Sequence, residues 1–162
     1  MRPTPRGRPP RRTTIRLRFA SVGAPGEPYP DWIRALRDVS GVYAIRELDD
    51  RGRPVLVYIG ESHTDNLYAT LTRHWQTWRR VGMARRETSH DPGVWYARER
   101  CEAAVLVTPA LNAPCVQDAL IDYLSPRDNL IRATASLADC PALRLAVAAD
   151  PIPVAPDDET PF

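Results

Sequence analysis

Hydrophobic and polar positions follow a β pattern in two runs near the middle of the chain. The runs GVYAIREL (41–48) and PVLVYIGES (54–62) are rich in β-branched and aromatic residues, which predicts two strands. Between them, DDRGR supplies the aspartates and the glycine that favour a tight turn. The sequence therefore predicts a β-hairpin over 41–62.

The register of this hairpin decides which side chains become neighbours. If the turn closes so that Glu47 pairs with Pro54, Tyr43 stands opposite Tyr58. Because side chains alternate between the two faces of a strand, two aliphatic residues would share the face of the tyrosines: Ile45 and Leu56. Taken alone, a tyrosine pair of this kind is typical of cross-strand packing that only stabilises a hairpin.

A helical pattern follows the hairpin. In DNLYATLTRHWQTWRR (65–80), four apolar residues fall on one stripe at helical spacing: Leu67, Leu71, Trp75 and Trp78. Asp65 or Asn66 is placed to cap the first turn. The pattern predicts an amphipathic helix over 65–80.

A second helix is predicted in CVQDALIDYLSPRDN (115–129), with Asn112 as its cap and Ser125-Pro126 as its stop. Three residues form most of its apolar stripe: Leu120, Ile121 and Leu124. Gln117 falls on the same stripe, three residues before the first of them. A glutamine among leucines raises the question of what it does there.

The remaining elements are short. Alternating apolar and basic residues in TIRLRFA (14–20) predict an edge strand, and Asp31 is placed to cap a helix in WIRALRDV (32–39). The apolar run AAVLV predicts another strand within 95–108. The order β-β-α-β-α across 41–130 predicts an α+β domain, a three-stranded mixed or antiparallel sheet flanked by helices.

The ends of the chain differ from this core in composition. The chain has 162 residues, of which 43% are apolar and 26% charged, and its formal net charge is +2. Seven arginines and no acid fall within residues 1–18, whereas five acids and one arginine fall within 135–162. We expect a disordered Arg/Pro arm at 1–13, one domain at 14–134 with its core at 38–132, and a flexible Pro/Asp-rich tail at 135–162.

Cysteine usage and hydropathy exclude several classes of protein. The three cysteines form no Cys-x-x-Cys pair, which indicates reduced thiols rather than a disulfide framework or a zinc site. No apolar run approaches the length of about eighteen residues that a membrane span needs. All 22 basic residues are arginine, so arginine richness by itself is weak evidence for nucleic acid. We expect a cytoplasmic protein without a membrane segment.

Four short elements occur in the order of a known nuclease family. The tripeptides Gly41-Val42-Tyr43 and Tyr58-Ile59-Gly60 lie on the predicted hairpin. Arg73 lies in the helix that follows, and PRDN (126–129) closes the last helix. The combination resembles the GIY-YIG nuclease superfamily over about residues 38–132, with valine replacing one isoleucine. It implies a small bacterial single-domain endonuclease that hydrolyses DNA phosphodiester bonds with one divalent cation, Mg²⁺ or Mn²⁺.

The resemblance also implies roles for individual residues. Tyr58 would act as the general base or orient the attacking water, with Tyr43 assisting. Because a free phenol has a pKa of about 10, a metal or an arginine must favour its ionised form. Arg73 would supply that charge and hold the scissile phosphate through two hydrogen bonds. His74 fits proton transfer, as in some family members, and fits packing or phosphate contact equally well. Asn129 would hold the local structure of the site.

Position 117 departs from the family pattern. The family's metal-ligating glutamate stands twelve residues before that asparagine, where this chain has Gln117. Because Mg²⁺ is held through carboxylates and substrate phosphates, the departure implies that cleavage is weakened or lost. Glu61 is the better alternative carboxylate, ahead of Asp118 and Glu102. Three explanations stay open: an inactive variant made for study, a natural member that only binds, or a metal held by another acid.

Arginines near the first helix and the third strand are the candidates for contacting DNA phosphates. Six residues make up this group: Arg79, Arg80, Arg85, Arg86, Arg98 and Arg100. The last two would alternate along the third strand. We expect DNA as the partner, with targeting supplied by a homodimer or a separate protein. Two other interpretations remain, a non-cleaving nucleic-acid-binding or regulatory module on the same scaffold and an α+β domain whose tyrosines only pack.

Overall fold

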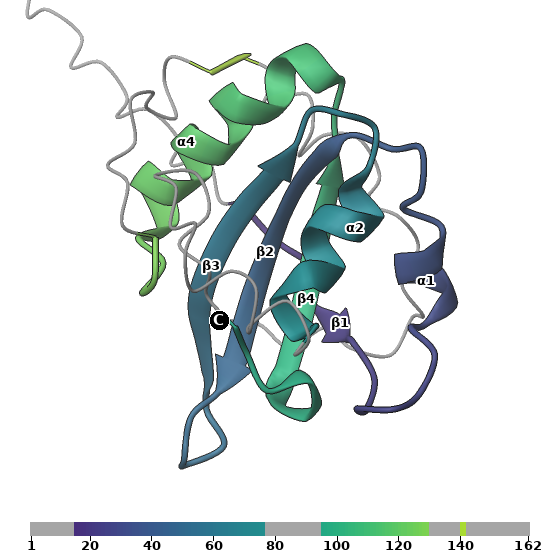
Figure 1. Cartoon of the computed structure of the whole chain (residues 1–162). Helices are drawn as coiled ribbons and strands as arrows, with labels where there is room; N and C mark the ends of the chain where they lie inside the picture. Colours follow the sequence, from purple (N-terminus) through teal and green to yellow (C-terminus); the bar gives the residue numbers. More distant parts are fainter. Residues whose placement is uncertain (1–14, 77–94, 130–139, 142–162) are drawn as a thin grey trace, which may run out of the picture.

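The structure, a computed structural model, describes residues 15–76, 95–129 and 140–141, in which four antiparallel strands form one sheet in the order β1-β4-β2-β3 (Figure 1). The strands are β1 (Ala20–Ser21), β2 (Gly41–Leu48), β3 (Pro54–Ser62) and β4 (Cys101–Val107). The helices are α1 (Asp31–Arg34), α2 (Leu67–Thr72) and α4 (Ala113–Leu124). Short 3₁₀ turns occupy Arg73–Trp75, Arg98–Arg100 and Ala110–Asn112. This is the α+β class that the sequence predicts.

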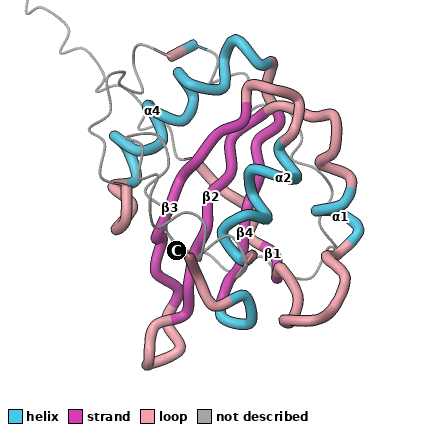
Figure 2. Tube along the Cα trace, in the orientation of Figure 1, coloured by secondary structure: helices cyan, strands magenta, loops and turns pink. Residues whose placement is uncertain are grey.

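Helices cover both faces of the sheet, with α2 on one side and α4 on the other (Figure 2). The α2-side cluster contains Val22, Ile33, Leu36, Tyr43, Ile45, Val57, Tyr58, Leu67, Leu71, Trp75, Tyr96, Cys101, Ala103 and Val105. The α4-side cluster contains Phe19, Val42, Ala44, Ile59, Ala104, Leu106, Ala113, Val116, Ala119, Leu120 and Cys140. Because neighbours along a strand point to opposite faces, β2 contributes alternate residues to the two clusters.

The two strands of the predicted hairpin are confirmed at both ends. β2 and β3 have the bounds expected from their pattern. At the turn, the Asp49 carboxylate accepts hydrogen bonds from the backbone N–H groups of Arg51 and Arg53, at 2.8 and 2.9 Å. The sheet contains the three strands predicted across 41–130 and one further edge strand, β1, which pairs with β4. Only Ala20, of the edge strand predicted at 14–20, belongs to it.

The predicted register of the hairpin is wrong by one residue beside the turn, where Glu47 stands opposite Val55, and by two residues at the tyrosines. Tyr43 stands opposite Gly60, and Ile45 stands opposite Tyr58. A slip of two residues keeps both tyrosines on one face, where their ring centroids lie 6.2 Å apart. A β-bulge shifts the pairing after Ile45, so that Arg46 stands opposite Leu56. The extra residue turns Leu56 to the α4-side cluster, away from the tyrosines.

The helices are shorter than their patterns predict. Asn66 caps α2 by accepting a hydrogen bond from the Ala69 N–H at 3.3 Å, as one of the two predicted caps. The helix then tightens into a 3₁₀ turn, and Gln76 is extended, so the predicted helix is interrupted at Gln76, and its last residues, 77–80, lie outside the described residues. Trp78 lies outside the described residues. α1 has four residues and begins at Asp31, with Pro30 in the capping position, so the predicted Asp31 cap is wrong; the Asp31 carboxylate pairs with Arg34 inside the helix.

The last strand and helix lie close to their predicted positions. β4 contains the apolar run, but Arg98 and Arg100 precede it in a 3₁₀ turn rather than alternating along it. α4 ends at Leu124 because Ser125 adopts a left-handed conformation with φ 49° before the proline. Asn112 precedes the helix without a side-chain capping bond.

The predicted arm and most of the predicted tail lie outside the described residues. Cys140, inside the tail, is described and is buried in the α4-side cluster, so the chain packs on the sheet at this residue. Among the residues that the structure describes, no helix is long and apolar enough to span a membrane.

Candidate active site

The glycines of the two tripeptides make room for close contacts across the sheet. A Cβ atom on Gly60 would collide with the hydroxyl and the ring carbon Cζ of Tyr43, which stands opposite. A Cβ atom on Gly41 would overlap the backbone carbonyl of Leu106 on β4. Glycine at position 60 therefore allows the Tyr43 ring to lie across β3 beside Tyr58.

Tyr43, Tyr58 and His74 form one compact group on the α2 side of the sheet. The Tyr43 hydroxyl lies 2.8 Å from His74 Nε2, and the phenol donates this hydrogen bond when Nε2 carries no proton. The Tyr58 ring lies against the same imidazole, with ring centroids 4.7 Å apart. The three residues come from β2, β3 and the 3₁₀ turn after α2, and none exposes more than 4% of its surface. We call them the Tyr–His cluster.

The spacing along α2 explains why His74 faces inward. His74 follows Leu67 by seven residues and Leu71 by three, so it lies on the same helical face as these two leucines. The chain tightens into a 3₁₀ turn over Arg73–Trp75, and both His74 and Trp75 are buried. Arg73, at the start of the turn, is half-buried. It adjoins the Tyr–His cluster through its backbone connection to His74.

Asn129 clamps the free edge of β3. Its side-chain carbonyl accepts a hydrogen bond from the Ile59 N–H, and its amide donates one to the Ile59 carbonyl, both at 2.8 Å. The two preceding residues also donate backbone hydrogen bonds to β3, from Arg127 to Leu56 and from Asp128 to Val57. The segment after α4 thus bonds to the strand on both sides of Tyr58 and holds the local structure there.

Two further residues of the site did not emerge from the sequence pattern. The Tyr96 hydroxyl donates to Asp128 Oδ2 at 2.9 Å, and the Tyr96 ring centroid lies 6.0 Å from that of His74. Burial, helped by the bond to Asp128, raises the pKa of Tyr96 well above its usual value. Arg127 donates two hydrogen bonds of 2.8 Å to Asp128 and holds the pKa of that carboxyl below its usual range. In the sequence, Asp128 stood out only as part of PRDN, and Tyr96 only as an aromatic residue next to Trp95.

Gln117 does not belong to the Tyr–His cluster. It lies on α4, which packs on the opposite face of the sheet through Val116, Ala119 and Leu120. Gln117 itself is half-buried, at the margin of that packed face. The amphipathic helix is confirmed, and the polar residue lies where its apolar face meets solvent.

The donor groups around these residues do not form a ready site for Mg²⁺. Within the described residues, no group of three His, Cys, Asp or Glu side chains could hold a metal ion. Glu61 accepts from or pairs with His63 Nδ1 at 2.9 Å, and Glu102 pairs with Arg46. Asp118 is half-buried on α4. Since Gln117 offers only a neutral amide, the present residues do not fit a hard dication by themselves.

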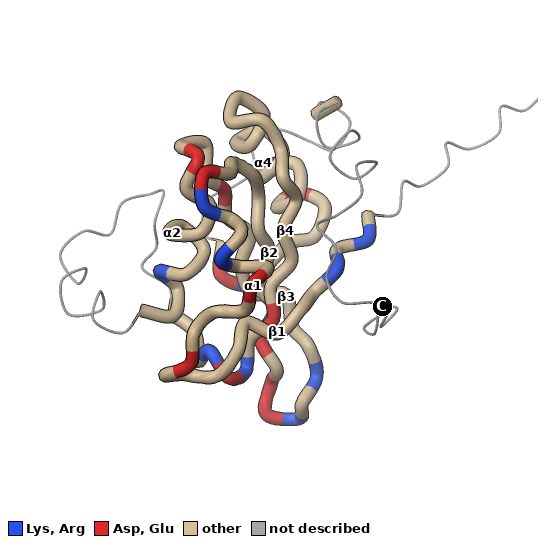
Figure 3. The backbone as a smooth tube through the Cα atoms, turned by 90° about the vertical axis from the view of Figure 1, so that its right-hand side faces the viewer, with Lys and Arg blue, Asp and Glu red and all other residues tan. Residues whose placement is uncertain are grey.

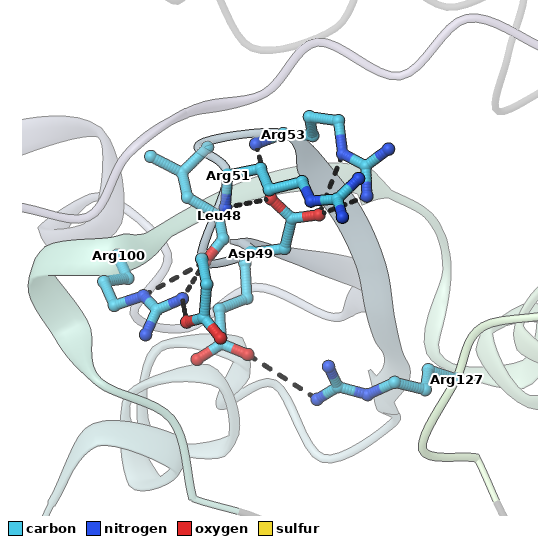
Figure 4. Close-up of polar contacts among 8 residues, drawn as sticks. Leu48, Asp49, Arg51, Arg53, Arg100 and Arg127 are labelled. Atoms are coloured by element: carbon cyan, nitrogen blue, oxygen red, sulfur yellow. Dashed lines mark hydrogen bonds and ion pairs between the residues drawn. The ribbon is translucent and has the colours of Figure 1, made fainter.

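The candidate DNA-contacting arginines divide into buried, paired and undescribed residues. Arg98 is buried and donates to the carbonyls of Val22, Glu27 and Pro28, so its expected exposure to phosphate is wrong. Arg100 donates from Nε to the Leu48 carbonyl at 3.0 Å and pairs with Asp50 (Figure 4). The other four arginines, Arg79, Arg80, Arg85 and Arg86, lie outside the described residues. In the described part, acidic and basic residues are interspersed, most visibly around the hairpin end (Figure 3).

Comparisons of the chain with known proteins found no relative. No protein-family model, no curated protein and no solved structure matches the chain. The GIY-YIG resemblance therefore depends on the motif residues quoted above.

Proposed function

We propose that this chain is a GIY-YIG-type, metal-dependent endonuclease scaffold acting on DNA phosphodiester bonds, in which Gln117 weakens or abolishes cleavage. The Tyr–His cluster is the observation that supports this proposal most. Both motif tyrosines contact the imidazole of His74, the residue after Arg73, and Tyr43 forms a 2.8 Å hydrogen bond with it. Residues far apart in sequence thus converge as a group that can exchange protons.

The chemistry of this group fits the handling of a proton during hydrolysis. An unprotonated Nε2 can accept the Tyr43 hydroxyl proton, and the imidazolium can return it. Tyr58, packed on the same imidazole, would orient the attacking water, and Arg73 would bind the phosphate oxygens. A divalent cation would stabilise negative charge on the phosphate. We assign no step to it, because the described residues do not fit a preformed metal site.

A second function, nucleic-acid binding without cleavage on the same scaffold, is favoured by two observations. The Tyr–His cluster is buried, so a phosphodiester does not reach the tyrosines in this conformation. At the ligand position that the resemblance implies, Gln117 also lacks the negative charge of a glutamate, which would attract a dication. Both functions predict salt-sensitive binding, since phosphate contacts release counterions and affinity falls steeply with salt.

A plasmid-nicking assay with Mg²⁺ or Mn²⁺ separates the two functions. We compare the chain with Gln117, the variant Gln117→Glu, and Gln117→Glu combined with Tyr58→Phe. We expect the glutamate to raise the nicking rate by roughly 10- to 100-fold, the range typical of changes at metal sites. The added Tyr58→Phe change should remove that gain, because it deletes the reacting hydroxyl and keeps the ring.

Each other outcome selects a different conclusion. Equal nicking by the chain with Gln117 and by Gln117→Glu would mean that another acid holds the metal. No nicking by any variant, together with salt-sensitive DNA binding, would replace the endonuclease proposal with the binding module. Absence of both activities would leave an α+β domain whose tyrosines only pack.

A further inference from the structure

Tyr96 connects the segments that carry the Tyr–His cluster and Asn129. Its backbone N–H donates to the His74 carbonyl at 3.1 Å, immediately after the buried 3₁₀ turn. Its hydroxyl donates to Asp128, one residue before the asparagine that clamps β3. Between these two attachments, the ring faces the imidazole of His74. Through its backbone and its side chain, Tyr96 thus links the 3₁₀ turn after α2 to the segment after α4.

Asp128 is the second attachment point, and it is held from three directions. Its backbone N–H donates to the Val57 carbonyl at 2.8 Å, next to Tyr58. Its carboxylate accepts hydrogen bonds from Tyr96 and two from Arg127. Arg127 in turn lies 3.5 Å from the Glu47 carboxylate on β2 (Figure 4). Because both carboxylate oxygens of Asp128 accept hydrogen bonds, the orientation of its side chain is fixed.

We propose that Tyr96 and Asp128 are positioning residues that hold His74 against Tyr58. The inference rests on the proposed function for its catalytic meaning, since neither residue is assigned contact with the reacting atoms. Without the Tyr96–Asp128 bond, the segment that carries Tyr96 would lose its attachment to Asp128, which is bonded to β3, and the Tyr96 ring would no longer hold the imidazole firmly against Tyr58. The distance between imidazole and phenol would then vary, and small displacements of reacting groups lower rates strongly.

The burial and hydrogen bonding of Tyr96 agree with this role. Tyr96 exposes 2% of its surface, and its raised pKa keeps it a neutral donor throughout the ordinary pH range. A neutral phenol and an ionised carboxylate form a charge-assisted hydrogen bond, which is stronger than a neutral pair. The bond therefore persists wherever the Asp128 carboxylate is ionised.

Imidazole NMR spectra test the inference without any cleavage assay. The chain has three histidines, so the His74 signal can be assigned by substitution, and exposed His63 serves as an internal reference. We expect Tyr96→Phe and Asp128→Ala to move the His74 imidazole signals and to alter their pH titration, with His63 unchanged. Asp128→Asn retains an oxygen that accepts from Tyr96, so it should restore most of the spectrum of the unsubstituted chain.

A matched stability control separates positioning from general loosening. Leu106→Ala removes a buried side chain of the α4-side cluster and should lower the stability of the chain without moving the His74 signals. The inference is overturned if Tyr96→Phe and Asp128→Ala leave these signals at their positions in the unsubstituted chain. It is also overturned if Leu106→Ala moves them equally.

Kinetics in the Gln117→Glu chain give the second readout. We expect Tyr96→Phe to lower kcat on the order of 10- to 100-fold with KM unchanged, because it displaces reacting groups without removing a phosphate contact. If Gln117→Glu itself does not cleave, the proposed function fails, whereas the NMR result still decides the positioning role. If it cleaves and Tyr96→Phe leaves kcat unchanged, the positioning role fails alone.

Discussion

The two faces of the sheet are built from different kinds of side chain. On the α4 side, aliphatic residues and alanines dominate, and helix and strands meet through Val116, Leu120 and Ile59. On the α2 side, three tyrosines surround a histidine, and hydrogen bonds join Tyr43 to His74 and Tyr96 to Asp128. An aliphatic face needs only shape and area, whereas a face with buried phenols and an imidazole must also satisfy each polar atom.

This difference separates stability from chemistry within one small domain. The buried residues of the α4-side cluster are apolar, and Gln117 lies at the margin of this cluster. The α2 side concentrates the titratable groups next to the free edge of β3, where Asn129 and Asp128 hold the strand. We therefore expect substitutions on the α4 side to change the free energy of unfolding, and substitutions on the α2 side to change the geometry of the site as well.

The largest loss of stability should follow Leu120→Ala. Leu120 exposes 1% of its surface in the α4-side cluster, so truncation removes apolar burial and leaves a cavity. We expect a loss of about 2–5 kcal/mol in the free energy of unfolding, measured by urea denaturation. Leu111→Ala is the matched control, because Leu111 is 95% exposed, and it should change stability by less than about 0.5 kcal/mol. Similar losses in both variants would show that α4 does not pack as described.

Gly60→Ala should destabilise the α2 side through collision with Tyr43. We expect a loss of about 1–3 kcal/mol, as for overpacked cores, although alanine alone suits a strand better than glycine. Thermal or urea unfolding measures the effect.

The matched test uses a Tyr43→Ala background, in which the collision partner is gone. There, Gly60→Ala should cost little or even stabilise, so the two changes should be strongly non-additive. An equal cost in both backgrounds would contradict the close approach of the Tyr43 ring to β3.

Asn129→Ala should open the edge of β3. Loss of the two hydrogen bonds to Ile59 should cost about 1–3 kcal/mol, since backbone groups lose their partners. Amide hydrogen exchange at Ile59 should accelerate more than exchange in β4. Asn129→Asp keeps an acceptor for the Ile59 N–H, so it should preserve protection of that amide better than alanine does. Unchanged protection in Asn129→Ala would rule out the clamp.

The smallest effect should be the pH dependence supplied by Asp128. Arg127 holds the pKa of Asp128 below that of the unfolded chain, so this stabilisation is complete above the ordinary carboxyl pKa of about 4. It is lost as the pH falls through the lowered folded value. Asp128→Asn should remove this contribution, about 1 kcal/mol or less because Arg127 is half-exposed.

Unfolding free energies measured between pH 2 and 6 check this prediction. Asp122→Asn removes an exposed carboxylate from α4 and controls for the loss of one charge. If both variants show the pH dependence of the unsubstituted chain, the Arg127–Asp128 pair contributes nothing to stability.

Several features of the site were readable from the sequence because their causes are local. The β-forming residues of 41–48 and 54–62 predicted the two strands that carry the tyrosines, and both strands have the predicted bounds. The GIY-YIG resemblance implied a structural role for Asn129, whose side chain bonds to Ile59. The roles of Tyr96 and Asp128 were not readable. Their contact joins residues 32 positions apart, and nothing in either local pattern specifies the partner.

What the sequence alone determined about this protein is its elements: the bounds of β2 and β3, the Asn66 cap and the stop at Ser125. Each follows from local backbone preferences and side-chain periodicity. Tertiary structure decided how these elements meet. The bulge that turns Leu56 away from Tyr58, the early end of α2 and the burial of Arg98 each depend on contacts between distant segments. Such contacts override local preference because buried polar groups must find partners and apolar surfaces must fit one another.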